Sequence, residues 1–220
     1  SSMSCGKAIE DRVNIIDAVF PIKKPDYVPK LFLTDEEQQY NNLSHLSSPI
    51  VMLGVLGSTP QKSMPYDYVA DLVNHITKTY KANILFNYAP HQKPEALKIY
   101  EQCIDKNQIH LDIYEDSVRG FIKLMNKCDI LVANEGGSVH MAKALNKSTF
   151  TIYSPYILKD HWASFEDGIL HESIHLLEEK PNLFTTSREQ RKEIEKDPTQ
   201  LYRELTPAMI IKKLDVFLKH

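Results

Sequence analysis

The chain of 220 residues is long enough to bury a core and to form one domain with an appendage. Its hydrophobic fraction of 42% and charged fraction of 25% are typical of a globular protein, and the net charge of −3 excludes a general electrostatic attraction for nucleic acid. The three cysteines are widely spaced and form no paired motif, so we expect reduced thiols in a cytoplasmic protein. No apolar stretch exceeds the length of a strand, and we expect neither a membrane span nor an export signal.

The first 48 residues differ in character from those that follow. Residues Lys7–Phe20 predict one helix, and three prolines then punctuate an extended polar stretch that ends at Ser48. We therefore expect residues 1–48 to be a linker that arrives from another unit. The domain proper should span residues 49–205.

Between residues 50 and 153, short β-branched runs alternate with amphipathic segments. Five strands are predicted, at Ile50–Leu56, Ile84–Tyr88, Ile109–Ile113, Ile130–Ala133 and Thr149–Tyr153. Helices are predicted between them, at Tyr66–Tyr80, at Pro94–Ile104, at Val118–Met125 with Asp116 or Ser117 as its cap, and at Ser138–Leu145. This alternation predicts a parallel, Rossmann-like α/β sheet with helices on both faces. Thr206 and Pro207 predict the start of a last helix within residues 206–220.

The most informative segment is the turn Glu135-Gly136-Gly137, which joins a buried strand to a helix. Two glycines let a ligand approach the backbone closely, and the unpaired first amides of a helix favour a phosphate. Glu135 would accept hydrogen bonds from sugar hydroxyls, while Ser138 and His140 lie on the first turn, where His140 could donate to a phosphate or sugar oxygen. Short glycine motifs also recur by chance, so a plain turn with a core histidine stays open.

A second loop, Gly57–Pro65, also joins a strand to a helix. Ser58 and Thr59 offer hydroxyl and backbone N–H groups, and Lys62 could neutralise the charge that builds on a departing diphosphate. The alternative for Lys62 is a solvated surface lysine. Because the carboxyl ends of parallel strands meet at one edge of the sheet, we expect the two loops to form one phosphate site.

Each of the two loops joins a predicted strand to a predicted helix. In this order along the chain, they resemble the nucleotide-sugar half of the lipopolysaccharide heptosyltransferases. These are GT-B glycosyltransferases with two Rossmann-like domains. The matching residues are Ser58, Thr59, Lys62 and Pro65 in the first loop and Asn134, Glu135, Gly137 and His140 in the second. The resemblance covers Pro49 to about Pro155. Three residues depart from the family pattern, since Glu135 replaces Asp, Gly136 replaces Ser or Thr, and Met64 replaces Trp.

The resemblance implies an inverting transfer of heptose from ADP-heptose to a lipid A–core acceptor at the cytoplasmic face of the inner membrane. It implies no metal or other cofactor, and the sequence has no Asp-x-Asp pair for a divalent ion. By analogy with the family, Gln92 and the loop that holds Asp116 lie where ribose and base could sit. The family's catalytic base belongs to an amino-terminal acceptor domain, which would also provide any peripheral membrane contact. Residues 1–48 resemble the end of that domain, so we expect this chain to bind donor but hardly to transfer it.

Other functions stay open. A different nucleotide sugar, or a non-catalytic nucleotide-binding module, would fit the same loops. His171-Glu172-Ser173-Ile174-His175 is a literal HExxH, which on a helix would bind zinc with Glu195 as a conceivable third ligand. Its apolar residues alternate as in a strand, however, which does not favour that site. Trp162 could cover the sugar, but we expect it to pack between the sheet and the last helix.

Overall fold

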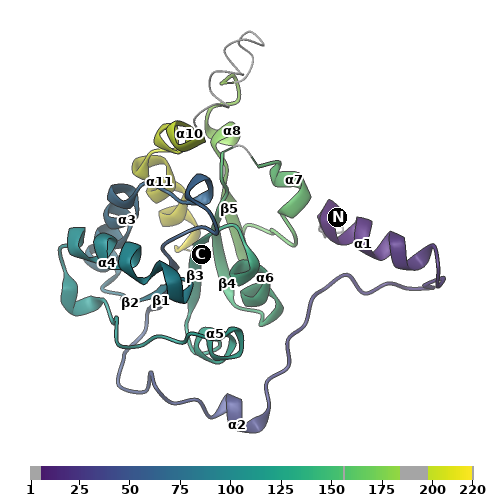
Figure 1. Ribbon diagram of the computed structural model, residues 1–220, viewed down its shortest axis with the longest axis horizontal. Coiled ribbons are helices and arrows are strands. Elements are labelled where there is room, and N and C mark those ends of the chain that lie inside the picture. Colours follow the sequence, from purple (N-terminus) through teal and green to yellow (C-terminus); the bar gives the residue numbers. More distant parts are fainter. Residues whose placement is uncertain (1–5, 156, 184–197, 220) are drawn as a thin grey trace.

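The computed structural model describes residues 6–155, 157–183 and 198–219 and contains a five-stranded sheet (Figure 1). The strands are β1 (Ile50–Gly54), β2 (Asn83–Asn87), β3 (Ile130–Asn134), β4 (Ser148–Ile152) and β5 (His171–Ile174). Their order across the sheet is β2-β1-β3-β4-β5, and every neighbouring pair is parallel. The predicted parallel α/β fold is confirmed.

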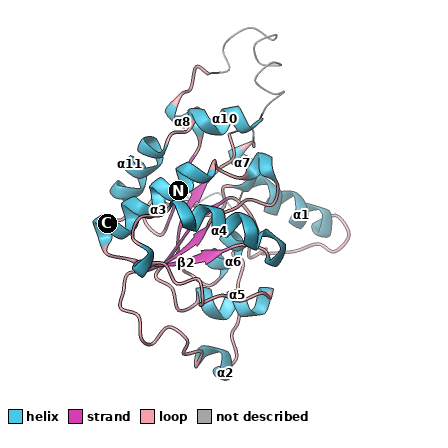
Figure 2. Cartoon of the chain, turned by 60° about the vertical axis from the view of Figure 1, so that its left-hand side comes forward, coloured by secondary structure: helices cyan, strands magenta, loops and turns pink. Residues whose placement is uncertain are grey.

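Helices cover both faces of this sheet because successive residues of a strand point to opposite sides. Val51 and Leu53 belong to the core that includes side chains of α3 (Tyr66–Tyr80), α4 (Lys93–Gln102) and α11 (Pro207–Phe217). Ile50 and Met52 belong to a second core, with side chains of α5 (Val118–Met125) and α6 (Gly137–Ala144). Figure 2 shows the strands enclosed by helices. Burial from both sides explains why the strands are nearly all apolar.

The strand predicted at Ile109–Ile113 is wrong. Only Ile109 pairs with the sheet, through one parallel bridge to Ile84. The chain then turns at Leu111, so that Ile109 packs in one core and Ile113 in the other. In a continuous strand, residues four positions apart lie on the same face of the sheet. Ile109 and Ile113 lie on opposite faces, so this segment cannot be one strand.

The remaining described elements are mostly short. They are α2 (Asp35–Gln38), α7 (Lys159–Trp162), α8 (Leu176–Glu179), α10 (Pro198–Glu204) and the 3₁₀ turns at Pro60–Lys62, Pro90–Gln92 and Lys106–Gln108. The last helix has Thr206 at its N-cap and Pro207 at its first position, as predicted. Within the described ranges, no helix is long and apolar enough to cross a membrane.

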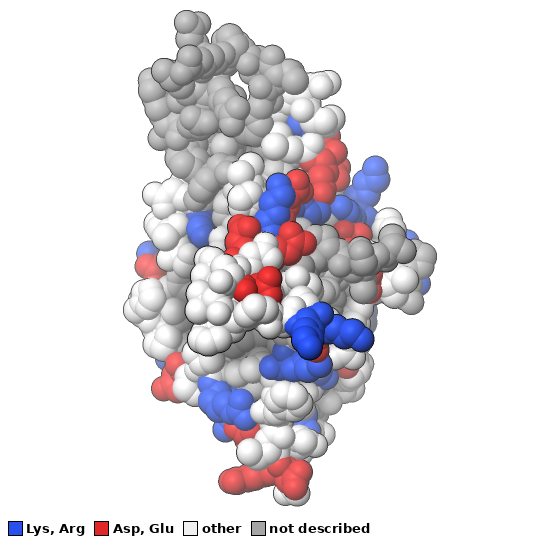
Figure 3. Space-filling view, turned by 90° about the vertical axis from the view of Figure 1, so that its right-hand side faces the viewer, with Lys and Arg blue, Asp and Glu red and all other residues white. Residues whose placement is uncertain are grey.

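Helix α1 (Lys7–Asp17) is three residues shorter than predicted, because the chain turns after Asp17. It has no buried residue, lies to the side of the sheet and packs against α7 (Figure 1). The chain from α1 to β1 is mainly irregular, apart from α2 and its capping box of Thr34 and Glu37. Among the described residues, acidic and basic side chains are interspersed on the face that carries α1 (Figure 3).

Candidate functional site

A cavity of about 660 Å³ opens where the strands β1, β2, β3 and β4 end. The chain crosses from β1 to β2 on one side and continues from β3 to β4 on the other, so β1 and β3 form the topological switch point of the sheet. Ligands of open parallel sheets bind in the crevice outside such a point. All the predicted donor-binding residues except Thr59 line this cavity, namely Ser58, Lys62, Gln92, Asp116, Glu135, Gly136, Gly137, Ser138 and His140.

Thr59 lies outside this cavity. It lines an adjoining one of about 540 Å³, which shares Leu56, Ser58 and Gln92 with the first. Thr59 therefore does not line the cavity in which we predicted the phosphate site. Its backbone carbonyl accepts a hydrogen bond from the hydroxyl of Ser63, at 2.9 Å.

The loop after β1 is folded tightly around Lys62. The Ser63 hydroxyl also accepts a hydrogen bond from the Gly57 amide, at 2.9 Å, which closes the loop. A Cβ atom on Gly57 would lie 2.2 Å from the carbonyl oxygen of Lys62, so only glycine allows this approach. The loop thereby holds the backbone of Lys62 at the cavity wall, while its side chain stays 36% exposed.

The turn after β3 presents bare backbone to the cavity. Gly136 is the N-cap of α6 and makes no side-chain capping hydrogen bond. The first intrahelical bonds are donated by Val139 and His140 to the Gly136 carbonyl, so the Gly137 and Ser138 amides precede the hydrogen-bonded part of the helix. A Cβ atom on either glycine would meet no other atom within 4 Å. Unpaired amides at the positive end of a helix form a ready site for an anion.

Glu135 does not project freely beside these amides. Its side chain is 8% exposed, and one carboxylate oxygen accepts a hydrogen bond from the Ser154 amide at 3.2 Å. The other oxygen lies 3.5 Å from the Lys62 ammonium. Burial raises the pKa of Glu135 above its ordinary value, although the Ser154 amide and Lys62 both favour the charged form. The two loops are thus joined by a half-buried ion pair.

A residue that the sequence did not suggest also joins the two loops. The hydroxyl oxygen of Tyr202, on α10, lies 3.1 Å from the Lys62 carbonyl oxygen and 3.4 Å from Asn134 Oδ1. Tyr202 is fully buried. In the same wall, Asn134 Nδ2 and Thr151 Oγ1 are buried and have no hydrogen-bond partner among the described residues. These two atoms therefore lack the hydrogen-bond partner that a buried polar group normally has.

Gln92 holds the end of the cavity that follows β2. Its amide nitrogen donates to the Gly57 carbonyl at 2.8 Å, and its amide oxygen accepts from the Ala89 amide at 2.9 Å. Both ends of the side chain are engaged, so Gln92 positions two loops. Asp116 is exposed, and Ser117 rather than Asp116 caps α5. Leu56, Val118 and Phe121 also line the cavity and supply apolar surface.

Trp162 and His140 lie at the opposite end of the cavity. The prediction that Trp162 packs between the sheet and the last helix is wrong, because the side chain is 40% exposed and lines the cavity from α7. The two ring centroids are 6.4 Å apart. Burial lowers the pKa of His140, and the nearby Lys143 and Arg12 lower it further, so the imidazole is neutral at pH 7.

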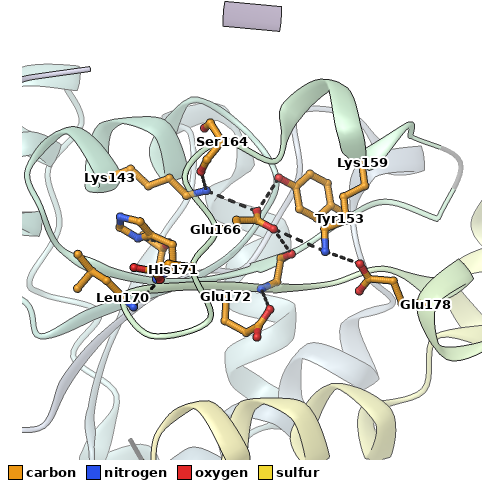
Figure 4. Close-up of polar contacts among 12 residues, drawn as sticks. Lys143, Tyr153, Lys159, Ser164, Glu166, Leu170, His171, Glu172 and Glu178 are labelled. Carbon is orange, nitrogen blue, oxygen red and sulfur yellow. Dashed lines mark hydrogen bonds and ion pairs between the residues drawn. The ribbon is translucent and has the colours of Figure 1, made fainter. Parts of the chain in front are cut away.

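A buried polar network supports α6 and the wall next to it (Figure 4). Lys143, near the end of α6, donates to the Ser164 carbonyl at 2.6 Å and lies 3.5 Å from Glu166. The Glu166 carboxylate also accepts hydrogen bonds from Tyr153, at 3.0 Å, and from Ser173. Burial lowers the pKa of Lys143, and burial with the adjacent Glu166 raises the pKa of Tyr153. Since Tyr153 lines the cavity, this network fixes part of its wall.

The HExxH segment is not a zinc site of the helical kind. His171 lies on β5 and contacts the Thr149 hydroxyl at 3.0 Å, as the predicted strand requires. His175 caps α8, and its two ring nitrogens contact the Leu177 amide and the Ile157 carbonyl. No three His, Cys, Asp or Glu side chains of the described residues gather as ligands for a metal ion. Glu195 lies outside the described residues.

Fold and site together define a Rossmann-like domain with a cavity at the switch point of its sheet, lined by the first amides of α6 and by Lys62. The chain belongs to glycosyltransferase family 9 (heptosyltransferase), whose sequence model matches residues 5–193. No curated protein sequence matches the chain significantly.

Solved structures agree with this fold. A glycosyl transferase family 9 protein from Veillonella parvula matches with a TM-score of 0.74 at 13% identity, over 98% of this chain and 60% of its own. The ADP-heptose lipopolysaccharide heptosyltransferase II of E. coli matches with a TM-score of 0.67 at 18% identity, over 90% of this chain and 56% of its own. E. coli heptosyltransferase WaaC, solved with ADP-2-deoxy-2-fluoro heptose, matches with a TM-score of 0.60 at 14% identity, over 94% and 54%. The chain therefore spans little more than half the length of these proteins.

Proposed function

We propose that this chain is the donor-binding half of a heptosyltransferase that takes ADP-heptose and transfers the heptose to a lipopolysaccharide core acceptor. The observation that carries the proposal is the meeting of two anion-binding features in one cavity: the bare amides at the start of α6 and the Lys62 ammonium. A diphosphate has the charge and the reach to engage both. Family membership, the likeness to the E. coli ADP-heptose lipopolysaccharide heptosyltransferase II, and the ADP-2-deoxy-2-fluoro heptose in the structure of E. coli WaaC support the choice of an ADP-linked sugar.

In the proposed reaction, the acceptor oxygen displaces the diphosphate from the anomeric carbon with inversion. Negative charge then develops on the leaving phosphate, where Lys62 and the amides of Gly137 and Ser138 stabilise it without a metal ion. Lys62 is placed for this role by backbone contacts to Gly57 and Tyr202, which do not involve its ammonium group. The base that takes the acceptor proton comes from a further domain, corresponding to the part of the matched structures that this chain does not cover.

In this proposal, residues 1–48 are the end of that further domain and the linker to residues 49–205. The enzyme then works at the cytoplasmic side of the membrane that holds the acceptor. The isolated chain should then bind donor and transfer little. We expect calorimetry to detect ADP-heptose and ADP, with much weaker binding of adenosine. Equal affinity for ADP and adenosine would contradict a site built around the diphosphate.

A different nucleotide sugar is the second candidate, and three observations favour testing it. Glu135 is longer than the family's Asp, and one of its carboxylate oxygens is already bound by the Ser154 amide. Gly136 supplies no hydroxyl, and Met64, at the position of the family's Trp, is buried in the core. Calorimetric titration with ADP-, UDP- and GDP-linked sugars separates the two candidates. Tightest binding of a UDP- or GDP-sugar would replace ADP-heptose as the donor.

A further inference from the structure

The two ends of the cavity differ in chemistry, and this difference assigns them to different parts of a ligand. The inference rests on the proposed function, because it takes the diphosphate to lie between Lys62 and Gly137. These residues follow β1 and β3, the two middle positions of the cavity. A nucleoside and a sugar on opposite sides of a diphosphate must then extend toward β2 and β4.

The β2 end suits a nucleoside. The lining residues that follow β2, namely Tyr88, Ala89 and Pro90, are largely apolar, so the flat face of a base can pack there. The Asp116 carboxylate also lines the cavity and can accept hydrogen bonds from ribose hydroxyls or from an exocyclic amine, whereas the Glu115 carboxylate already accepts one from the Tyr40 hydroxyl at 2.8 Å. The sugar is therefore left with the β4 end.

The β4 end contains the indole of Trp162, which is contacted by Arg12 of α1. The Arg12 guanidinium of α1 lies 5.9 Å from the centroid of the Trp162 ring. Arg119 and Arg203 pair with Glu37 and Asp67, but Arg12 pairs with no carboxylate of the described residues and donates only to its own helix, at the Ala8 carbonyl. The contact with Trp162 is thus a cation–π contact that competes with no ion pair.

We propose that Trp162 binds the sugar of the nucleotide-sugar donor, with the C–H face of a pyranose ring against the indole, and that Arg12 is a positioning residue for that indole. An aromatic face is negatively polarised, and the axial C–H groups of a sugar are positively polarised, so the two surfaces attract. The 40% exposure of the indole leaves contact area for a ligand. His140, 6.4 Å away by ring centroid, borders the same subsite and can hydrogen-bond a sugar hydroxyl.

Trp162 is the only tryptophan of the chain, so its fluorescence reports on this subsite alone. Titration of the whole chain with ADP-heptose should shift or quench the emission. ADP should bind, as measured by calorimetry, with little change in emission. An equal emission change with ADP alone would place the nucleoside against the indole and overturn the assignment.

Variants separate a binding role from a packing role. Trp162→Ala should keep the affinity for ADP and reduce the additional affinity for ADP-heptose by roughly two- to tenfold. Trp162→Phe should keep part of that addition, since it keeps an aromatic face. Arg12→Ala should lower the emission response while the affinity for ADP stays the same.

The same measurements can refute the inference. One refuting result is that Trp162→Ala gains as much affinity from the sugar of ADP-heptose as the wild type does. Another is that this variant loses affinity for ADP and for ADP-heptose equally, because a purely structural role of Trp162 predicts an equal loss. A wild-type chain that binds no nucleotide at all would refute the proposed function together with the inference. Binding of ADP with normal affinity and no role for Trp162 would refute the inference alone.

Discussion

The replacement of Lys62 by alanine tests how the cavity handles negative charge. The Lys62→Ala variant should keep its fold, because the loop is held by the backbone of Lys62: its carbonyl accepts from Tyr202, and the same carbonyl packs against Gly57. What disappears is the ammonium group beside the cavity and its 3.5 Å contact with Glu135. The variant therefore removes a charge from the site and leaves the walls in place.

The magnitude follows from the exposure of the side chain and from its present partner. A hydrogen bond to a charged group contributes about 1.5–3 kcal/mol, and each 1.4 kcal/mol changes an affinity about tenfold. Because Lys62 is 36% exposed and is already paired with Glu135 in the free protein, we expect the lower part of this range. The affinity for ADP should fall about ten- to thirtyfold, while the affinity for adenosine should hardly change.

Isothermal titration calorimetry with ADP and with adenosine measures both effects. The matched control is Lys98→Ala, which removes the same charge from an exposed position on α4. This control should bind ADP as the wild type does. The reasoning is refuted if Lys62→Ala weakens ADP and adenosine equally, or if Lys98→Ala loses as much affinity for ADP as Lys62→Ala.

Three further changes test other parts of the site. Gly137→Val should abolish ADP binding and leave thermal unfolding unchanged, because an added Cβ meets nothing within 4 Å; retained binding would show that the turn does not face the ligand. Glu135→Gln should tighten ADP binding at neutral pH roughly three- to tenfold by removing a negative charge. The gain over the wild type should shrink as the pH falls through the raised pKa of Glu135, because protonation removes the same charge from the wild type. A gain that does not depend on pH would contradict this raised pKa. Burial lowers the pKa of His171 to about 4, so the unfolded chain binds its proton first and the folding stability it contributes is lost as the pH falls from about 6.5 toward 4. His171→Asn should lose less stability over that range, by as much as about 3 kcal/mol in urea unfolding, and an unchanged pH slope would argue against a buried neutral imidazole.

Local patterns predicted the elements that carry the site. The stripe of Val118, Phe121, Ile122 and Met125, with a cap at Asp116 or Ser117, predicts α5, although Val118 is exposed in the structure and Ser117 is the cap. The apolar run before Asn134 predicts β3. The alternation in the HExxH segment predicts β5 rather than a zinc-binding helix, which the structure confirms. These signals are predictable because they depend on residues within one or two turns of each other.

The failures concern contacts between residues far apart in the chain. The run Ile109–Ile113 is apolar enough for a strand, yet its two isoleucines pack on opposite faces of the sheet. Trp162 has the residue type of a core side chain, but it lies on α7 at the cavity, and α7 packs against α1. Neither outcome follows from the secondary-structure propensity of the residues, because tertiary contacts determine where these two segments lie.

The polar contacts behind the site were also outside the reach of sequence reasoning. Tyr202 contacts the Lys62 loop from a helix near the carboxyl terminus, and no motif marks it. Lys143 looks like an ordinary helix lysine, but its side chain is 2% exposed and pairs with Glu166. Charged residues are seldom buried, so a sequence pattern predicts them as solvated unless a partner is known.

The most direct test of the account is a crystal structure of the chain with ADP-heptose bound. We expect the diphosphate against the amides of Gly137 and Ser138, with Lys62 within hydrogen-bonding distance of a phosphate oxygen. A diphosphate located elsewhere, with the Gly136-Gly137 turn in contact only with solvent or protein, would contradict the account.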